Sequence, residues 1–410
     1  MPSRREFLKK SAGSVLLAGS SSLAATFSQA AIPGLPAELS EGARESAVLE
    51  ALPGKFPLIK KSYRPPNYET PVEYFAEPIT PNKAFFVRYH LASIPEVDAA
   101  QWRLKVGGES SATPFELSLE ELKKSFEPVE LTALCLCSGN RRGMFQPHVA
   151  GVEWGLGAMG NALWKGARLK DLLAKSGIKK EAVEVTFNGA DAAVVAKTPD
   201  FVKSIPVAKA LDENTLIAYE MNGAPIPHWN GFPARVIVPG WTGTYWMKHV
   251  TDIDAVSTPF QGFWMKSAYR IPKGKFPIVD RFISQETDAN TPITEMVVAS
   301  LITSPASGQQ VRRGQTLEVV GLAWDAGYGI NGVEVSVDGG ETWRSAKLGK
   351  DHGRFSFRQW NLKMVPETKG TMSVLAKATN RIGATQTFEL IHNPAGYHHN
   401  VVQRVDIDVV

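Results

Sequence analysis

The spacing of short apolar segments toward the C-terminal end constrains the fold of this 410-residue chain more than any other feature. From Val297 onward, turn residues such as those at 338–340 separate short segments that have the composition of strands. Between residues 332 and 337 the valines alternate, so they share one face of an extended strand. About seven short strands in about 110 residues are typical of an immunoglobulin-like β-sandwich. We predict this domain over residues 293–410, with strands at 299–302, 316–323, 332–337, 354–360, 371–379 and 386–391.

Residues 81–292 mix strand and helix patterns. Apolar segments bounded by Gly and Pro predict strands at 85–87, 102–106, 183–187 and 235–238. Short helices are predicted at 117–126 and 168–176, and Ser118 precedes two acids as an N-cap residue does. We therefore predict an α+β chain, mixed but mostly β, with residues 81–292 as the first domain and the sandwich as the second. We expect Trp246, Phe263 and Trp264 to pack in the core.

The first 80 residues predict an export signal followed by an extended arm. Arg4-Arg5 begins a twin-arginine pattern, and the apolar residues 15–27 are too few to span a bilayer. Residues 28–30 resemble a small-residue cleavage site. Residues 1–30 therefore predict export to the periplasm by the twin-arginine route, which carries folded proteins, often with a cofactor in place. Residues 31–80 are rich in proline and predict an extended arm that wraps a globular body.

Composition and missing motifs argue against several functions. The formal net charge is +4, and removal of residues 1–30 lowers it to about +1, which gives no support for nucleic-acid binding. No later segment is apolar enough for a membrane helix. The sequence contains no Cys-x-x-Cys-His motif, no cysteine spacing for an iron–sulfur cluster, no P-loop and no dinucleotide fingerprint. We therefore expect no haem on this chain and no nucleotide or hydride-carrier chemistry.

One short segment holds both cysteines, Cys135 and Cys137, and ends with Arg141 and Arg142. Two cysteines one residue apart cannot form an ordinary disulfide. Nearby guanidinium charge favours the thiolate, which binds soft or high-valent metals. Adjacent arginines can also bind a small oxyanion. Cys137 is therefore either a metal ligand beside an anion site or a buried structural thiol.

Other basic side chains leave two interpretations open. Arg88 and His90 fall on one face of a predicted strand, where they either hold an anion or a cofactor oxygen or form a polar strand edge. Arg235 lies inside an apolar strand and needs a partner if it is buried, either a phosphate or an internal ion pair. Lys248 is a compact cation that follows Gly243, where the backbone can approach a ligand closely.

In their order along the chain, these segments resemble the sulfite oxidase family of molybdenum enzymes. The resemblance covers nearly all of the chain after the signal, and the ordered set is far more specific than any one segment. The segments are Phe-Val-Arg-Tyr-His at 86–90, Cys-Ser-Gly-Asn-Arg-Arg at 137–142, 152–154, 162–166, 218–223, 231–240, Lys248, Tyr269, and 321–324 and 333–343 in the sandwich. The twin-arginine pattern points to the bacterial periplasmic members, the cytochrome c-linked sulfite dehydrogenases, whose molybdenum-bearing subunit this chain resembles.

The resemblance implies a sulfite-oxidase-type molybdopterin-binding domain with a molybdenum–molybdopterin cofactor, in which Cys137 is the single protein ligand to the metal. The residues implied at the substrate are Arg88, His90, Arg142 and Tyr269, with Trp154 lining the site. The implied cofactor contacts are Phe86, Val87, Arg88, Tyr89, His90, Asp191, Asn230, Arg235, Trp246, Met247 and Lys248. Asn230 departs from the family's animal members, which carry a histidine there. Asparagine can donate a hydrogen bond but carries no charge, and His228 could partly substitute.

The function implied by the resemblance is oxidation of sulfite to sulfate. Electrons would pass singly to a c-type cytochrome, either a bound subunit or a docking partner. The sandwich of this family commonly serves dimer formation, so a homodimer or a heterodimer with the cytochrome is expected.

Two other interpretations stay open. The first is a related oxidoreductase of the same fold, such as a sulfane dehydrogenase or a methionine sulfoxide reductase, although the reductases typically lack the sandwich. The second is an exported, non-catalytic binding protein that uses the sandwich as an adhesion module.

Overall fold

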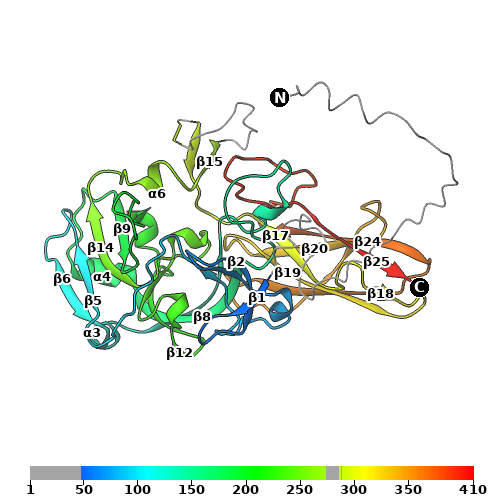
Figure 1. The fold of residues 1–410 in the computed structure, drawn as a ribbon, viewed down its shortest axis with the longest axis horizontal. Helices are drawn as coiled ribbons and strands as arrows, with labels where there is room; N and C mark the ends of the chain where they lie inside the picture. Colours follow the sequence, from blue (N-terminus) through cyan, green and yellow to red (C-terminus); the bar gives the residue numbers. More distant parts are fainter. Residues whose placement is uncertain (1–47, 274–285, 288) are drawn as a thin grey trace, which may run out of the picture. The chain divides into compact units, whose positions relative to one another are not determined.

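The computed structural model describes residues 48–273, 286–287 and 289–410 (Figure 1). The predicted signal, residues 1–30, and the first part of the predicted arm, residues 31–47, lie outside the described residues. Among the described helices, none has both the length and the apolar character that crossing a membrane requires.

The described part of the arm forms an antiparallel sheet with the order β1-β2-β3-β4. Its strands are β1 (Val48–Ala51), β2 (Pro57–Ser62), β3 (Asn67–Glu69) and β4 (Val87–Arg88), and the 3-10 helix η1 (Val72–Phe75) follows β3. The strand predicted at 85–87 is therefore the short β4. Because Asn67 pairs with Arg88 and Tyr68 with Val87, the arm fixes the strand that carries Arg88.

Two larger sheets build the region before the sandwich. One has the order β10-β9-β14-β5-β6, and the other has the order β12-β11-β8-β7 with β13 paired to β11. Only the β14–β5 pair among them is parallel in the part of the chain described here. The strands are β5 (Arg103–Gly107), β6 (Phe115–Ser118), β7 (Val129–Leu136), β8 (Met159–Arg168), β9 (Glu184–Gly189), β10 (Lys203–Pro206), β11 (Leu216–Met221), β12 (Ala224–Pro225), β13 (Arg235–Ile237) and β14 (Val250–Val256), followed by the pair β15 (Arg270–Pro272) and β16 (Asn290–Pro292).

Short helices connect these strands. They are α3 (Leu119–Ser125), α4 (Leu169–Lys175), α5 (Val207–Ala210) and α6 (Phe263–Lys266), with the 3-10 helices η2 (Arg142–Met144), η3 (His228–Asn230) and η4 (Gly243–Tyr245). The predicted N-cap of α3 is present, because Ser118 and Glu121 form a reciprocal capping box. Trp246 is buried as predicted, but Phe263 is 44% exposed, because α6 directs Met265 inward instead.

The C-terminal domain is the predicted sandwich, and the α+β, mostly β fold class is confirmed. Its two sheets have the orders β17-β19-β23-β22 and β18-β25-β24-β20-β21. The strands are β17 (Ala299–Ser304), β18 (Gln310–Val311), β19 (Leu317–Trp324), β20 (Ile330–Ser336), β21 (Arg344–Ser345), β22 (Lys347–Leu348), β23 (Arg358–Met364), β24 (Gly370–Asn380) and β25 (Gln403–Val409).

One predicted strand of the sandwich is wrong, and the prediction missed the two-residue strands β18, β21 and β22 and the longer β25. Residues 386–391 form no strand. The carboxamide oxygen of Gln386 accepts instead from Ser300 Oγ at 2.7 Å, and Phe388 is exposed, so the apolar side chains of this segment do not enter the core. The last strand is β25, whose inward residues alternate as the period of a strand requires.

The sandwich packs against the β7–β8 hairpin through one shared apolar cluster. Its members include Leu134, Leu136 and Met159 from the hairpin and Leu301, Leu322, Trp324 and Phe357 from the sandwich. Arg141 crosses the same boundary, since its guanidinium donates to Ser300 O at 2.6 Å and lies 5.5 Å from the Trp324 ring centroid. Residues 137–142, which we name the cysteine loop, therefore lie where the two domains meet.

We expect Leu322→Ala to lower the free energy of unfolding by about 2–5 kcal/mol, because it opens a cavity in this fully buried cluster. Urea denaturation measures the change. Val365→Ala is the matched control, since Val365 is 46% exposed and its truncation should change stability by less than about 0.5 kcal/mol. If both variants lose the same free energy of unfolding, the shared cluster does not contribute the expected stability.

Candidate functional site

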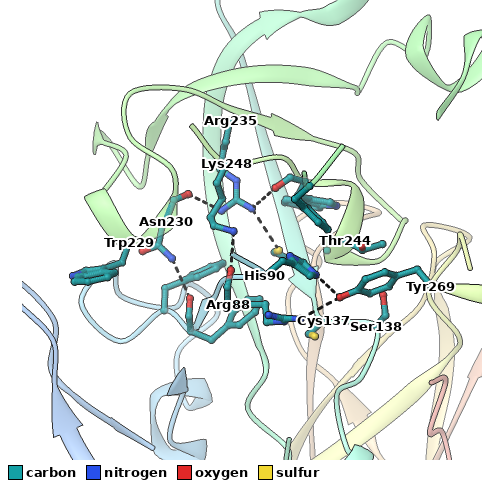
Figure 2. A pocket seen from close by; sticks show the side chains of 16 residues that line it. Arg88, His90, Cys137, Ser138, Trp229, Asn230, Arg235, Thr244, Lys248 and Tyr269 are labelled. Carbon is teal, nitrogen blue, oxygen red and sulfur yellow. Dashed lines mark hydrogen bonds between the residues drawn. The ribbon is translucent and has the colours of Figure 1, made fainter. Parts of the chain in front are cut away.

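Side chains from distant segments converge on one cavity beside the cysteine loop (Figure 2). They come from the region around β4, the end of β7, the loop before β10, the turn before β13, η4 and the residue before β15. The lining residues are Phe85, Phe86, Arg88, His90, Cys135, Cys137, Ser138, Phe201, Trp229, Asn230, Arg235, Gly243, Thr244, Trp246, Lys248 and Tyr269.

The cysteine loop is a turn that leaves Cys137 at the cavity wall. Cys137 N donates to Ala158 O and Asn140 N donates to Cys137 O, both at 2.9 Å. Asn140 Oδ1 accepts from Ala158 N at 3.0 Å, which ties the turn to the start of β8. A Cβ at Gly139 would lie 2.5 Å from the Arg142 guanidinium, so a larger residue there would displace this side chain.

Cys135 lines the same cavity, because residues two apart on a strand share a face. Burial raises the pKa of the Cys135 thiol to about 11, although an Arg235 nitrogen lies 4.0 Å from its Sγ. This thiol therefore stays protonated at neutral pH. Cys137 is the more exposed of the two, 8% against 2%, and is the better placed candidate for a metal ligand.

Tyr269 connects the candidate anion-binding groups. Its hydroxyl lies 3.3 Å from an Arg88 nitrogen and forms a hydrogen bond with His90 Nε2 (Figure 2). Burial raises the pKa of Tyr269 and lowers the pKa of His90 well below its ordinary value, so the phenol is protonated and the imidazole is neutral at pH 7. A fixed cation and two neutral polar groups therefore face the same end of the cavity as Cys137.

Buried cations and an amide form the opposite part of the site. Arg235 donates to Asn230 O at 2.8 Å and to Trp246 O at 3.1 Å. Lys248 Nζ donates to Arg88 O at 2.7 Å. These charges have backbone carbonyls as partners, so their positive charge is not neutralised by the hydrogen bonds.

Asn230 replaces the histidine of the family's animal members, and both polar atoms of its side chain form hydrogen bonds. Asn230 Nδ2 donates to Phe86 O at 3.1 Å, and Asn230 Oδ1 accepts from Lys55 Nζ at 2.5 Å. Lys55 comes from the arm, is 7% exposed and also donates to Phe85 O at 3.0 Å. His228 does not line the cavity, so the charge next to Asn230 comes from Lys55.

Some predicted residues lie outside the cavity wall. Those that the structure brings together are Phe86, Arg88, His90, Cys137, Asn230, Arg235, Trp246, Lys248 and Tyr269. Val87 and Tyr89 point the other way, because side chains alternate along a strand, and they pack in a separate apolar cluster. Asp191, Met247 and Trp154 are buried without lining the cavity.

Arg142 is also buried, and it is not one of the residues that line the cavity. Its Nε donates to Ala395 O at 2.9 Å, and its NH1 donates to Val152 O at 3.1 Å. The guanidinium lies 5.2 Å from the ring centroid of Tyr397, which belongs to the sandwich. The structure therefore shows Arg142 as a contact between the two domains, and its predicted role at the substrate stays a prediction.

Sequence reasoning missed several residues of the site. Ser138 and Thr244 line the cavity and are neighbours of predicted segments, so their position in the chain was a usable signal. Phe201 stacks on His90 with ring centroids 3.6 Å apart. Neither Phe201 nor Lys55 carries a local signal, because each reaches the site only through the tertiary fold.

Both domains match described families. Residues 90–264 match the oxidoreductase molybdopterin binding domain, and residues 290–410 match the Mo-co oxidoreductase dimerisation domain. Mitochondrial sulfite oxidase of Rattus norvegicus is 36% identical over 395 residues, covering 91% of this chain and 71% of the relative. The Homo sapiens enzyme is 36% identical over 373 residues, covering 87% and 67%. The crystal structure of the sulfane dehydrogenase SoxCD from Paracoccus pantotrophus has a TM-score of 0.73 at 24% identity and covers 96% of both chains.

The cavity fits the molybdenum–molybdopterin cofactor that the first family implies. None of the described lining residues is an aspartate or a glutamate, whereas Arg235 and Lys248 are buried cations. Ser138 Oγ, Thr244 Oγ1 and Arg235 Nε are buried in the wall without a hydrogen-bond partner. An anionic, oxygen-rich group satisfies both conditions. The chain binds this cofactor, as both sets of relatives indicate, and this cavity is the candidate site for it.

We expect two buried amines to contribute more stability to the cofactor-free protein as the pH rises from about 7 to about 10. Burial lowers the pKa of Lys55 from 10.5 to about 7 and that of Lys248 from 10.5 to about 8. In this range the unfolded chain binds protons on both amines that the folded chain does not, so unfolding becomes less favourable with rising pH.

Melting temperatures of the cofactor-free protein between pH 7 and pH 10 measure this effect. Lys55→Met and Lys248→Met should flatten the slope. Lys60→Met is the control, because Lys60 forms a partly exposed ion pair with Glu50 outside the cavity. If the melting temperature changes with pH in the same way in all four proteins, the pKa values of Lys55 and Lys248 are not lowered by burial.

Proposed function

The chain belongs to the sulfite oxidase family of molybdenum oxidoreductases, as its sequence predicts, and on this basis we propose that it oxidises sulfite to sulfate. The observation that carries the proposal is the convergence of Arg88, His90 and Tyr269 beside Cys137 in a wall that contains no described carboxylate. Sulfite is a small oxyanion, and a guanidinium with two polar neighbours binds such an anion well. The sulfite oxidases of rat and human at 36% identity support the same substrate.

The reaction is SO₃²⁻ + H₂O → SO₄²⁻ + 2H⁺ + 2e⁻. The bound molybdenum centre supplies the two-electron redox chemistry. Arg88 binds and neutralises the anion, and Tyr269 orients it through its hydroxyl. In the proposed arrangement the Tyr269 hydroxyl accepts from Arg88 and donates to His90 Nε2, which assigns the proton of the neutral imidazole to Nδ1. That nitrogen is buried without a partner, which makes it a free donor to an oxygen of the anion or of the cofactor.

We propose a c-type cytochrome as the electron acceptor and the periplasm as the location. The twin-arginine pattern at residues 4–5 supports export with the cofactor in place. The reaction releases two electrons, and a haem protein accepts them one at a time. The match of residues 290–410 to a dimerisation domain supports a dimer, either with a second copy or with the cytochrome.

Purified periplasmic enzyme should reduce cytochrome c when sulfite is added and should show a molybdenum(V) paramagnetic resonance signal. Thiosulfate and methionine sulfoxide are the comparison substrates. Turnover of thiosulfate or of a sulfoxide without turnover of sulfite would instead support one of the related oxidoreductases, and a protein without molybdenum would support the non-catalytic interpretation.

We expect Cys137→Ser to lose activity, because the hydroxyl replaces the thiolate that binds molybdenum. Cys135→Ser is a matched control, since this thiol lines the same cavity two residues away and stays protonated. It should keep molybdenum and most of its turnover. Metal analysis and steady-state rates check both variants, and full turnover in Cys137→Ser would refute the ligand assignment.

Arg88→Ala should raise the KM for sulfite by roughly 10- to 100-fold, which corresponds to the loss of a hydrogen bond to a charged group. The kcat should change less. Arg103→Ala is the control, because this guanidinium bonds to backbone carbonyls on an exposed part of β5. An unchanged KM in Arg88→Ala would contradict its role in anion binding.

A further inference from the structure

A loop of the sandwich reaches the substrate end of the cavity. Tyr397 is only 6% exposed, and its ring stacks on Tyr269 with centroids 5.5 Å apart and an angle of 11° between the planes. The same ring lies 5.2 Å from the Arg142 guanidinium. One residue of the second domain therefore contacts both Tyr269 and Arg142, the last residue of the cysteine loop.

The conformation of this loop is fixed from within. Asn393 Nδ2 donates to Tyr397 O at 2.8 Å, and Asn393 Oδ1 accepts from Tyr397 N at 3.0 Å. Gly396 has a φ of +63°, and a Cβ there would lie 2.7 Å from Arg142 Cγ and 2.5 Å from a Val149 methyl carbon. Only glycine lets the loop backbone pack this closely on Arg142 and Val149, and this packing places Tyr397 next to them.

The conformation of Tyr269 depends on its stacking contact with Tyr397, because its backbone is in an unfavourable region. Its φ of +57° is in the left-handed region, which a residue with a bulky side chain adopts only when its surroundings hold it there. Its ring is held by Tyr397 and by Lys203, whose Nζ lies 5.1 Å from the ring centroid. The Tyr269 hydroxyl keeps its bonds to Arg88 and His90 only in this position.

Tyr397 also lines a second cavity. That cavity has a volume of about 160 Å³ and is lined by Tyr397, Ile271, Val297, Thr387 and His392, among others. Tyr269 lines the first cavity and Tyr397 the second, so the stacked pair separates them. Loss of the Tyr397 ring would let Tyr269 move toward the second cavity and would enlarge the substrate end of the first.

We propose that Tyr397 is a positioning residue that determines specificity: its ring holds Tyr269 against Arg88 and His90 and keeps the substrate end too narrow for sulfur compounds larger than sulfite. This inference rests on the proposed function and extends it. Tyr397 acts through Tyr269 and touches neither the cofactor cavity nor the substrate directly.

The test compares Tyr397→Leu, which removes the ring, with Tyr397→Phe, which keeps it. In Tyr397→Leu we expect the KM for sulfite to rise roughly 2- to 12-fold, the value of one aromatic pair, with a smaller change in kcat. The ratio of kcat/KM for sulfite to that for thiosulfate should fall by a similar factor. Tyr397→Phe and the surface control Phe388→Leu should behave as wild type, since Phe388 is 58% exposed.

Two further measurements separate positioning from general damage. Molybdenum content and the dissociation constant of sulfate, measured by calorimetry on the holoenzyme, should show intact cofactor loading with weaker anion binding in Tyr397→Leu. Combined with Tyr269→Phe, the variant should cause no further rise in the KM for sulfite, because Tyr397 acts on the anion through the Tyr269 hydroxyl. If Tyr397→Leu does not fold, Tyr397→Met replaces it as a ringless variant with a flexible side chain.

Three results would overturn the inference. They are an unchanged substrate ratio in Tyr397→Leu, an additive rise in the KM for sulfite in the double variant, and a Tyr397→Phe variant as impaired as Tyr397→Leu. A wild-type enzyme that does not oxidise sulfite would overturn the proposed function instead.

Discussion

Burial of positive charge without a neutralising carboxylate in the cavity wall is the constraint on which the rest of the site depends. A buried cation is costly unless it is paired or hydrogen-bonded. Arg235 and Lys248 use backbone carbonyls as acceptors, and Lys55 uses the Asn230 carboxamide, so none of these hydrogen bonds brings a negative charge to the buried cation. The cavity is therefore arranged for an anionic cofactor, and the surrounding backbone is fixed by the same hydrogen bonds.

Local sequence patterns predicted the parts of the site that lie on one continuous segment. Strand alternation correctly sets Arg88 and His90 on the cavity face, and the same rule directs Val87 and Tyr89 away from it. The cysteine loop was predictable, because a thiol and its flanking turn are adjacent in the chain. The sandwich was predictable from strand spacing, except where the Gln386 side chain replaced backbone pairing.

Contacts between distant segments were beyond such patterns. Lys55 meets Asn230 across 175 residues, and Arg142 meets Ala395 across 253 residues. A family resemblance assigns Arg142 to the substrate, but it does not carry the loop geometry that turns the guanidinium toward Tyr397. Side-chain direction at a domain boundary depends on both surfaces, and a single segment contains only one of them.

The stacked tyrosines also imply an order of events during synthesis. The cysteine loop leaves the ribosome well before Tyr397, since translation proceeds from the N-terminus. A nascent chain that ends before residue 393 has Arg142 and Tyr269 but lacks the loop that covers them. The wall at the substrate end therefore depends on residues that are among the last to be synthesised.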